Sequence, residues 1–135
     1  MMMKKMEEPD IATMSDKIIH ITSKKEHDEL LAANKDQYWI LDFHASWCGP
    51  CHMIAPVFEQ SANNYPSIKF AKIDVDAVPD LAQHYRIRAM PTFKVVRYAG
   101  GENENAEDPK EQVDTLQGAS KERLVALVEK IDGLA

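Results

Sequence analysis

Apolar residues occur along the chain in short blocks, separated by polar stretches. Blocks that are nearly continuous or mostly apolar, as in strands covered on their faces, occupy residues 17–22, 38–45, 68–74, 92–98 and 113–116. The block at 38–45, YWILDFHA, is the most apolar and indicates a central buried strand. The pattern therefore predicts five strands.

Four helices are predicted between and after these strands. A helix over residues 51–65 is indicated by apolar residues on one stripe, and residues 124–131 carry a similar stripe. Gly133 is expected to end the last helix. The other starts are marked by capping residues or proline: Ser23 with Glu26, Pro79 and Ser120.

The order of elements is strand, helix, strand, helix, strand, helix, strand, strand, helix. Strands that alternate with helices pair in parallel through right-handed crossovers, whereas the last two strands, joined by a loop, should be antiparallel. We therefore expect an α/β fold with a mixed sheet and helices on both faces. Residues 16–135 should form this domain, and residues 1–15 a disordered extension.

Composition excludes several classes of function. The chain has 22 acidic and 16 basic residues and a net charge of −6, which argues against nucleic-acid binding. No run of about 20 apolar residues predicts a membrane span, and the N-terminus lacks the pattern of a signal or transit peptide. We expect a cytoplasmic protein that acts on soluble protein partners.

The two cysteines lie three residues apart in the sequence Trp47-Cys48-Gly49-Pro50-Cys51, where the central strand gives way to a helix. The helix N-terminus favours a thiolate at Cys48. Cys51, one turn further on, is expected to be more buried. This arrangement predicts that Cys48 attacks a target disulfide and that Cys51 resolves the mixed disulfide.

Two other interpretations of the cysteine pair are less favoured. A zinc site needs four ligands, and only His44 and His52 are near in sequence. A purely structural disulfide would close a loop too small to restrain the unfolded chain much.

The segment WCGPC, preceded by LDFHAS and followed by HMIAPVFEQ, closely resembles the thioredoxin family. The likeness continues through FAKIDVD, RIRAMPTF and LQGAS and covers residues 17–131. It implies the thioredoxin fold, a mostly five-stranded sheet flanked by four helices. It also implies a protein-disulfide reductase without a bound cofactor or metal, recycled by thioredoxin reductase, a separate flavoprotein that uses NADPH.

The resemblance also implies roles for residues outside the cysteine pair. Asp42 matches a buried aspartate that exchanges protons with Cys51 through water, and Lys72 matches the lysine beside it. Pro91 matches a cis-proline, and the backbone of Met90 would pair with an extended client segment. Thr92 follows in the same motif. An apolar rim around Cys48 would consist of Trp47, Pro50, Ala89, Met90, Gly118 and Ala119.

Pro50 bears on the direction of electron transfer, and other residues depart from the family pattern. Oxidising relatives carry histidine in the position of Pro50; because Pro50 adds no charge to favour the thiolate, we expect a reductant. His44 and His52 are interpreted as tolerated substitutions. Residues 100–111 form an insertion with five acids and one base, expected to be a solvated loop.

Alternative functions remain open at the level of sequence. One is a thioredoxin-fold binding subunit of a larger assembly, with the N-terminal extension and the acidic insertion as contact surfaces. Another is an oxidase or isomerase. With no third cysteine available for a covalent dimer, we expect a monomer.

Overall fold

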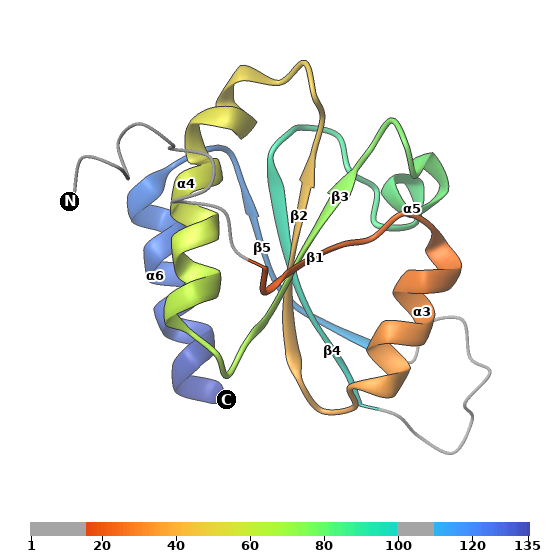
Figure 1. Ribbon diagram of the computed structural model, residues 1–135, viewed down its shortest axis with the longest axis vertical. Helices are drawn as coiled ribbons and strands as arrows, with labels where there is room; N and C mark the ends of the chain where they lie inside the picture. The colour runs from red at the N-terminus through yellow and green to blue at the C-terminus, as the bar shows by residue number, and fades with distance from the viewer. Residues whose placement is uncertain (1–15, 100–109) are drawn as a thin grey trace.

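The computed structural model describes residues 16–99 and 110–135. The predicted extension, residues 1–15, and most of the predicted insertion, residues 100–111, lie outside the described residues; residues 110 and 111 belong to the last strand. The order of elements agrees with the prediction (Figure 1). The elements are β1 (Ile18–His20), α3 (Lys24–Ala33), β2 (Tyr38–His44), α4 (Gly49–Asn64), β3 (Lys69–Asp74), α5 (Pro79–His84), β4 (Thr92–Tyr98), β5 (Lys110–Gln117) and α6 (Lys121–Leu134).

The five strands form one sheet in the order β1-β3-β2-β4-β5. Strands β1, β3 and β2 are parallel, whereas β4 is antiparallel to β2 and β5 is antiparallel to β4. This confirms the predicted mixed sheet. In the register of β2 and β3, Asp42 lies opposite Lys72, so the two predicted ionisable site residues are cross-strand neighbours.

Helices α4 and α6 cover one face of the sheet, and α3 and α5 cover the other (Figure 1). On the first face Phe58 of α4 packs against Phe70 and Phe93 of the sheet. On the second, Tyr85 packs against Phe43. Burial of each such side chain contributes roughly 1.5–3 kcal/mol, so the stability of the domain resides in these two layers.

Two helix boundaries differ from the prediction. Helix α4 begins at Gly49 rather than at Cys51, because Cys48 itself caps the helix and its sulfur accepts the Cys51 N–H. Helix α6 runs through Gly133, so the predicted stop is wrong. Glycine costs only about 1 kcal/mol relative to alanine in a helix, and the backbone ladder continues past it to the Ala135 N–H, which donates to Ile131.

The other predicted helix starts are confirmed. The Ser23 hydroxyl accepts the Glu26 N–H at 3.0 Å, and the Glu26 carboxylate accepts the backbone N–H of Thr22 at 2.8 Å. Ser120 caps α6 through the Arg123 N–H. Within the two described ranges, none of the helices combines the length and apolarity needed to cross a membrane.

Candidate active site

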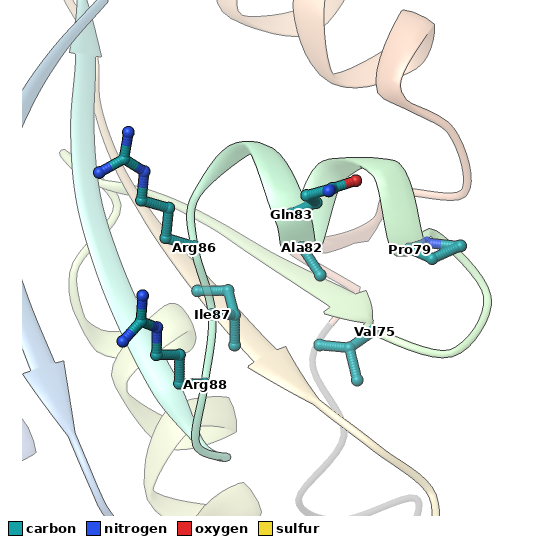
Figure 2. A pocket seen from close by; sticks show the side chains of 7 residues that line it. All are labelled: Val75, Pro79, Ala82, Gln83, Arg86, Ile87 and Arg88. Atoms are coloured by element: carbon teal, nitrogen blue, oxygen red, sulfur yellow. The ribbon is translucent and has the colours of Figure 1, made fainter.

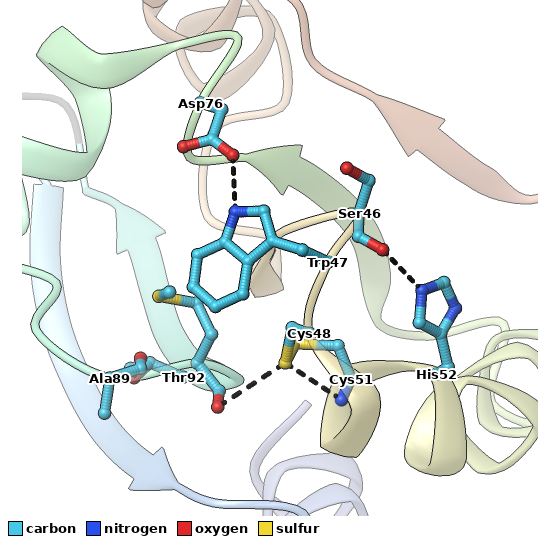
Figure 3. Close-up of a disulfide and its surroundings, with 9 residues drawn as sticks. Ser46, Trp47, Cys48, Cys51, His52, Asp76, Ala89 and Thr92 are labelled. Carbon is cyan, nitrogen blue, oxygen red and sulfur yellow. Dashed lines mark hydrogen bonds between the residues drawn. A yellow bond between two sulfur atoms is a disulfide. The ribbon is translucent and has the colours of Figure 1, made fainter.

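The two cysteines form a disulfide at the carboxyl end of β2 (Figure 3). Cys48 is the N-cap of α4 and Cys51 lies in its first turn, with their Cα atoms 5.3 Å apart. Both residues are buried, with 4% and 5% of their surface exposed. The expected greater burial of Cys51 is therefore wrong for the disulfide form, because the bond draws both sulfurs into the same layer.

The sulfur of Cys48 lies where a helix favours negative charge. The Cys51 N–H donates to Cys48 Sγ at 3.1 Å, and the Cys48 carbonyl accepts the His52 N–H at 3.3 Å, which begins the helical ladder. Pro50 in the first turn suits a position where its missing N–H would have no helical partner. An amide aimed at the sulfur, together with the helix dipole, stabilises a thiolate over a thiol at Cys48.

The loop before β4 forms the opposite wall of the site (Figure 3). The Met90–Pro91 peptide is cis, as the family resemblance implied, and the Met90 carbonyl oxygen lies 3.7 Å from Cys48 Sγ. The Thr92 hydroxyl donates to the Ala89 carbonyl at 2.6 Å, and the Pro91 carbonyl accepts the Gly118 N–H at 2.9 Å. These bonds tie the loop to the start of β4 and to the end of β5.

The predicted rim residues differ in exposure. Trp47 is 67% exposed, and its indole N–H donates to the Asp76 carboxylate at 2.8 Å (Figure 3). Gly49, Pro50 and Ala89 are exposed, whereas Met90, Gly118 and Ala119 are half-buried, and Pro91 and Thr92 are buried. Ala119 packs against the core under α4 and α6. Trp47 is thus a surface residue, as predicted, and the rim combines exposed and partly covered positions.

Asp42 is buried on β2, as predicted, with 1% of its surface exposed. Its Oδ1 has no hydrogen-bond partner among the described residues. Desolvation by burial raises the pKa of Asp42 from 3.8 to about 7; the Lys72 ammonium opposes this rise and the Glu59 carboxylate adds to it. A carboxyl group with a pKa near neutrality can accept and return a proton at physiological pH.

Lys72 lies closer to an acid that the sequence did not single out. Its Nζ is 3.9 Å from the Glu59 carboxylate on α4, and both side chains are only about one-seventh exposed (14% and 13%). The signal for Glu59 in the sequence was its position eight residues after Cys51, two helical turns further along α4. Its contact with Lys72 depends on how α4 is rotated above the sheet, which spacing alone does not specify.

The two histidines beside the site have different surroundings. His52 Nε2–H donates to the Ser46 carbonyl at 2.8 Å, which fastens the turn before Cys48 to the helix after it (Figure 3). Burial, followed by the nearby Lys72 charge, lowers the pKa of His44. Within residues 16–99 and 110–135, no three His, Cys, Asp or Glu residues are grouped so as to hold a metal ion.

Comparison with known proteins places this geometry in a family. The Thioredoxin family model matches residues 18–130. The chain is 42% identical over 125 residues to a thioredoxin of Neurospora crassa, covering 90% of this chain and 92% of that protein. It is 43% identical over 120 residues to an H-type thioredoxin of Chlamydomonas reinhardtii, covering 87% and 96%.

Solved structures of thioredoxins have the same fold as this chain. The X-ray structure of Fasciola hepatica thioredoxin superposes with a TM-score of 0.73 at 31% identity, covering 84% of this chain and 98% of that one. The fold and the cysteine pair define a thiol–disulfide oxidoreductase. The chain belongs to the thioredoxin family, and its Cys48–Cys51 pair makes it a protein-disulfide reductase.

Proposed function

We propose that the protein carries electrons from a separate, NADPH-dependent flavoprotein, thioredoxin reductase, to the disulfides of client proteins. The observation that supports this most directly is the placement of Cys48 Sγ at the N-cap of α4 with the Cys51 amide donating to it. A sulfur in this position is a ready nucleophile once the disulfide is reduced. Cys51, three residues further along the chain, can then close the disulfide again.

The exchange proceeds in two steps. The Cys48 thiolate attacks one sulfur of a client disulfide, the client S–S bond breaks, and the other client sulfur leaves as a thiolate. The Cys51 thiolate then attacks Cys48 Sγ, closing the disulfide seen here and releasing the first client sulfur. The client gains two electrons and two protons, and the reductase returns two electrons to the Cys48–Cys51 disulfide.

Asp42 is the proposed proton acceptor for Cys51, acting through water. Burial that holds its pKa near 7 lets it take the thiol proton as Cys51 attacks and give it up afterwards. Lys72, opposite Asp42 in the sheet register, is the proposed partner that limits how far this pKa rises. The two residues act on the resolving step and leave the first attack to Cys48.

Client recognition is proposed to use main-chain groups of the loop opposite the disulfide. Met90, whose carbonyl faces Cys48, would pair with an extended client segment, held in place by Pro91 and Thr92. The rim residues Trp47, Pro50, Ala89, Gly118 and Ala119 would contact client side chains. Main-chain pairing of this kind accepts many client sequences.

A coupled assay tests the proposed electron path. Purified thioredoxin reductase, NADPH and insulin are combined with the protein, and NADPH oxidation is followed at 340 nm. We expect rapid, insulin-dependent oxidation that Cys48→Ser abolishes, with His20→Gln, a change at an exposed residue of β1, as the matched control. If the protein accelerates insulin reduction when dithiothreitol is supplied in a separate reaction but supports no NADPH oxidation with the reductase, the reductase is rejected as the electron source.

The cellular location and the oligomeric state of the protein are proposed as well. We propose a cytosolic monomer, in keeping with the resemblance to H-type thioredoxins and with an acidic surface that opposes self-association. Cell fractionation and sedimentation equilibrium test the two parts separately. Enrichment in an organelle fraction, or a mass of twice 15.3 kDa, would reject the corresponding part.

A further inference from the structure

A groove of about 500 Å³ opens between α5 and the segment that leads to the cis-proline (Figure 2). Its apolar lining comes from Val75, Pro79, Ala82 and Ile87. Val75 also packs against the cluster formed by Ala45 and the two cysteines. The groove therefore adjoins the surroundings of the disulfide.

Two arginines line the same groove, on either side of Ile87. Figure 2 shows the Arg86 and Arg88 side chains pointing away from the segment in one direction, while Ile87 turns toward Val75 and Ala82. Both arginines are exposed, and neither forms an ion pair with any residue in the described ranges. In a chain of net charge −6, they place positive charge beside an apolar surface.

The backbone that carries these arginines is fixed. The Arg86 N–H donates to the Gln83 carbonyl at 3.0 Å and the Ile87 N–H donates to the Ala82 carbonyl at 2.9 Å. Arg86 has φ of 56°, in the left-handed region where glycine is favoured and other residues cost roughly 1–2 kcal/mol. The turn therefore presents a long cationic side chain at a position where a glycine would be accommodated with less strain.

Resting on the proposed function, we propose that this groove selects clients with an aspartate or glutamate two to four residues from the cysteine that Cys48 attacks. Arg88 precedes Met90 by two residues and Arg86 by four, and four residues span at most about 14 Å, so both arginines lie within reach of client residues close to the attacked cysteine. A client segment paired with Met90 is therefore expected to lie near both arginines. Each guanidinium can take a client carboxylate through two parallel hydrogen bonds, and an apolar client side chain can enter the groove against Val75 and Ile87.

Matched peptides test the proposal. Each is a twelve-residue peptide with one cysteine, blocked as a mixed disulfide with 2-mercaptoethanol. One carries glutamates two and four residues before the cysteine, a second carries them after it, and a third carries glutamines at all four positions. The reduced protein is mixed with each peptide, and the released peptide thiol is quantified by chromatography over a single turnover to give the second-order rate constant.

Exposed ion pairs are individually weak, so we expect one glutamate peptide to exceed the glutamine peptide about 3- to 10-fold at low salt. The ratio should fall toward 1 in 0.5 M NaCl. It should also fall toward 1 in Arg86→Gln/Arg88→Gln and stay at the wild-type value in Arg123→Gln, which removes an exposed arginine of α6 on the other face of the sheet. Because each ratio is taken within one variant, a general loss of activity does not affect it.

The outcomes separate the two proposals. Equal rates for all three peptides in the wild-type protein, or a glutamate preference that survives in the double variant, would overturn the selection of acidic clients and leave disulfide reduction intact. Failure of the wild-type protein to reduce any peptide or insulin would overturn the proposed function and this inference with it.

Discussion

Replacing Asp42 by asparagine should stabilise the oxidised protein above pH 7 and change its stability little near pH 4. The Asp42 carboxyl is buried without a hydrogen-bond partner on Oδ1 among the described residues, and burial raises its pKa from 3.8 to about 7. The folded state therefore holds a proton that the unfolded chain has already released between these two pH values. Stability falls as the pH rises through this window, because the folded state binds more protons.

The size of the effect follows from the two pKa values. Each tenfold difference in proton affinity is worth about 1.4 kcal/mol, so a change from 3.8 to about 7 corresponds to a penalty of about 4 kcal/mol that is complete above pH 7. Asparagine cannot ionise and removes this penalty. The buried amide has unpaired groups that cost roughly 1–3 kcal/mol at every pH, and the buried protonated carboxyl of the wild type carries a comparable cost, so the two proteins differ little near pH 4.

The assay is urea denaturation of the oxidised wild-type and Asp42→Asn proteins at half-unit steps from pH 4 to pH 8, with linear extrapolation to water. The free-energy difference between the two proteins should grow in favour of the variant by about 4 kcal/mol across this range. Glu129→Gln, at an exposed position of α6, is the control and should change the stability by less than about 0.5 kcal/mol. A difference between wild type and Asp42→Asn that is the same at pH 4 and pH 8 would refute the assigned burial and titration of Asp42.

Two further predictions concern the groups around Asp42 and the core beneath it. Glu59→Gln should lower the pKa of Asp42, because it removes a nearby negative charge, and Lys72→Met should raise this pKa, because it removes a positive one. Carboxyl NMR titration of the oxidised protein measures both pKa shifts, and shifts in the same direction would contradict this assignment. Phe58→Ala should destabilise the fold by about 3–5 kcal/mol, because the ring is fully buried against the sheet. Met53→Ala, at a 76% exposed position of the same helix, is the control and should change stability by less than about 0.5 kcal/mol. Equal losses of unfolding free energy in urea denaturation of the two variants would contradict the packing.

The sequence predicted the fold because its signals are local. The apolar run at 38–45 indicated a covered strand, and Ser23 and Ser120 cap their helices as expected. Gly133 misled because a glycine near a chain end is a weak stop signal when the backbone ladder continues past it. The start of α4 was misplaced because a cysteine is an unusual N-cap, and its sulfur accepts the amide that a serine or aspartate oxygen normally would.

The candidate site could be predicted only in part. The local motif around Cys48 and Cys51 indicated their chemistry, because their roles depend on neighbours in sequence, whereas the cis-proline at Pro91 was implied by the family resemblance. The contact of Glu59 with Lys72 depends on the rotation of a helix over a strand, and the groove beside Arg86 depends on a left-handed turn without glycine. Neither leaves a periodic or compositional trace, so both emerged only from the three-dimensional arrangement.

The most direct test of the central claim is the identity of the cysteine that first bonds to a client. Cys51→Ser and Cys48→Ser are each reduced and mixed with insulin, and the adducts are mapped by mass spectrometry of tryptic peptides. We predict that Cys51→Ser accumulates a stable mixed disulfide at Cys48, while Cys48→Ser forms no adduct at Cys51 on the same timescale and does not reduce insulin. An adduct that forms equally fast at Cys51, or insulin reduction retained in Cys48→Ser, would contradict Cys48 as the nucleophile.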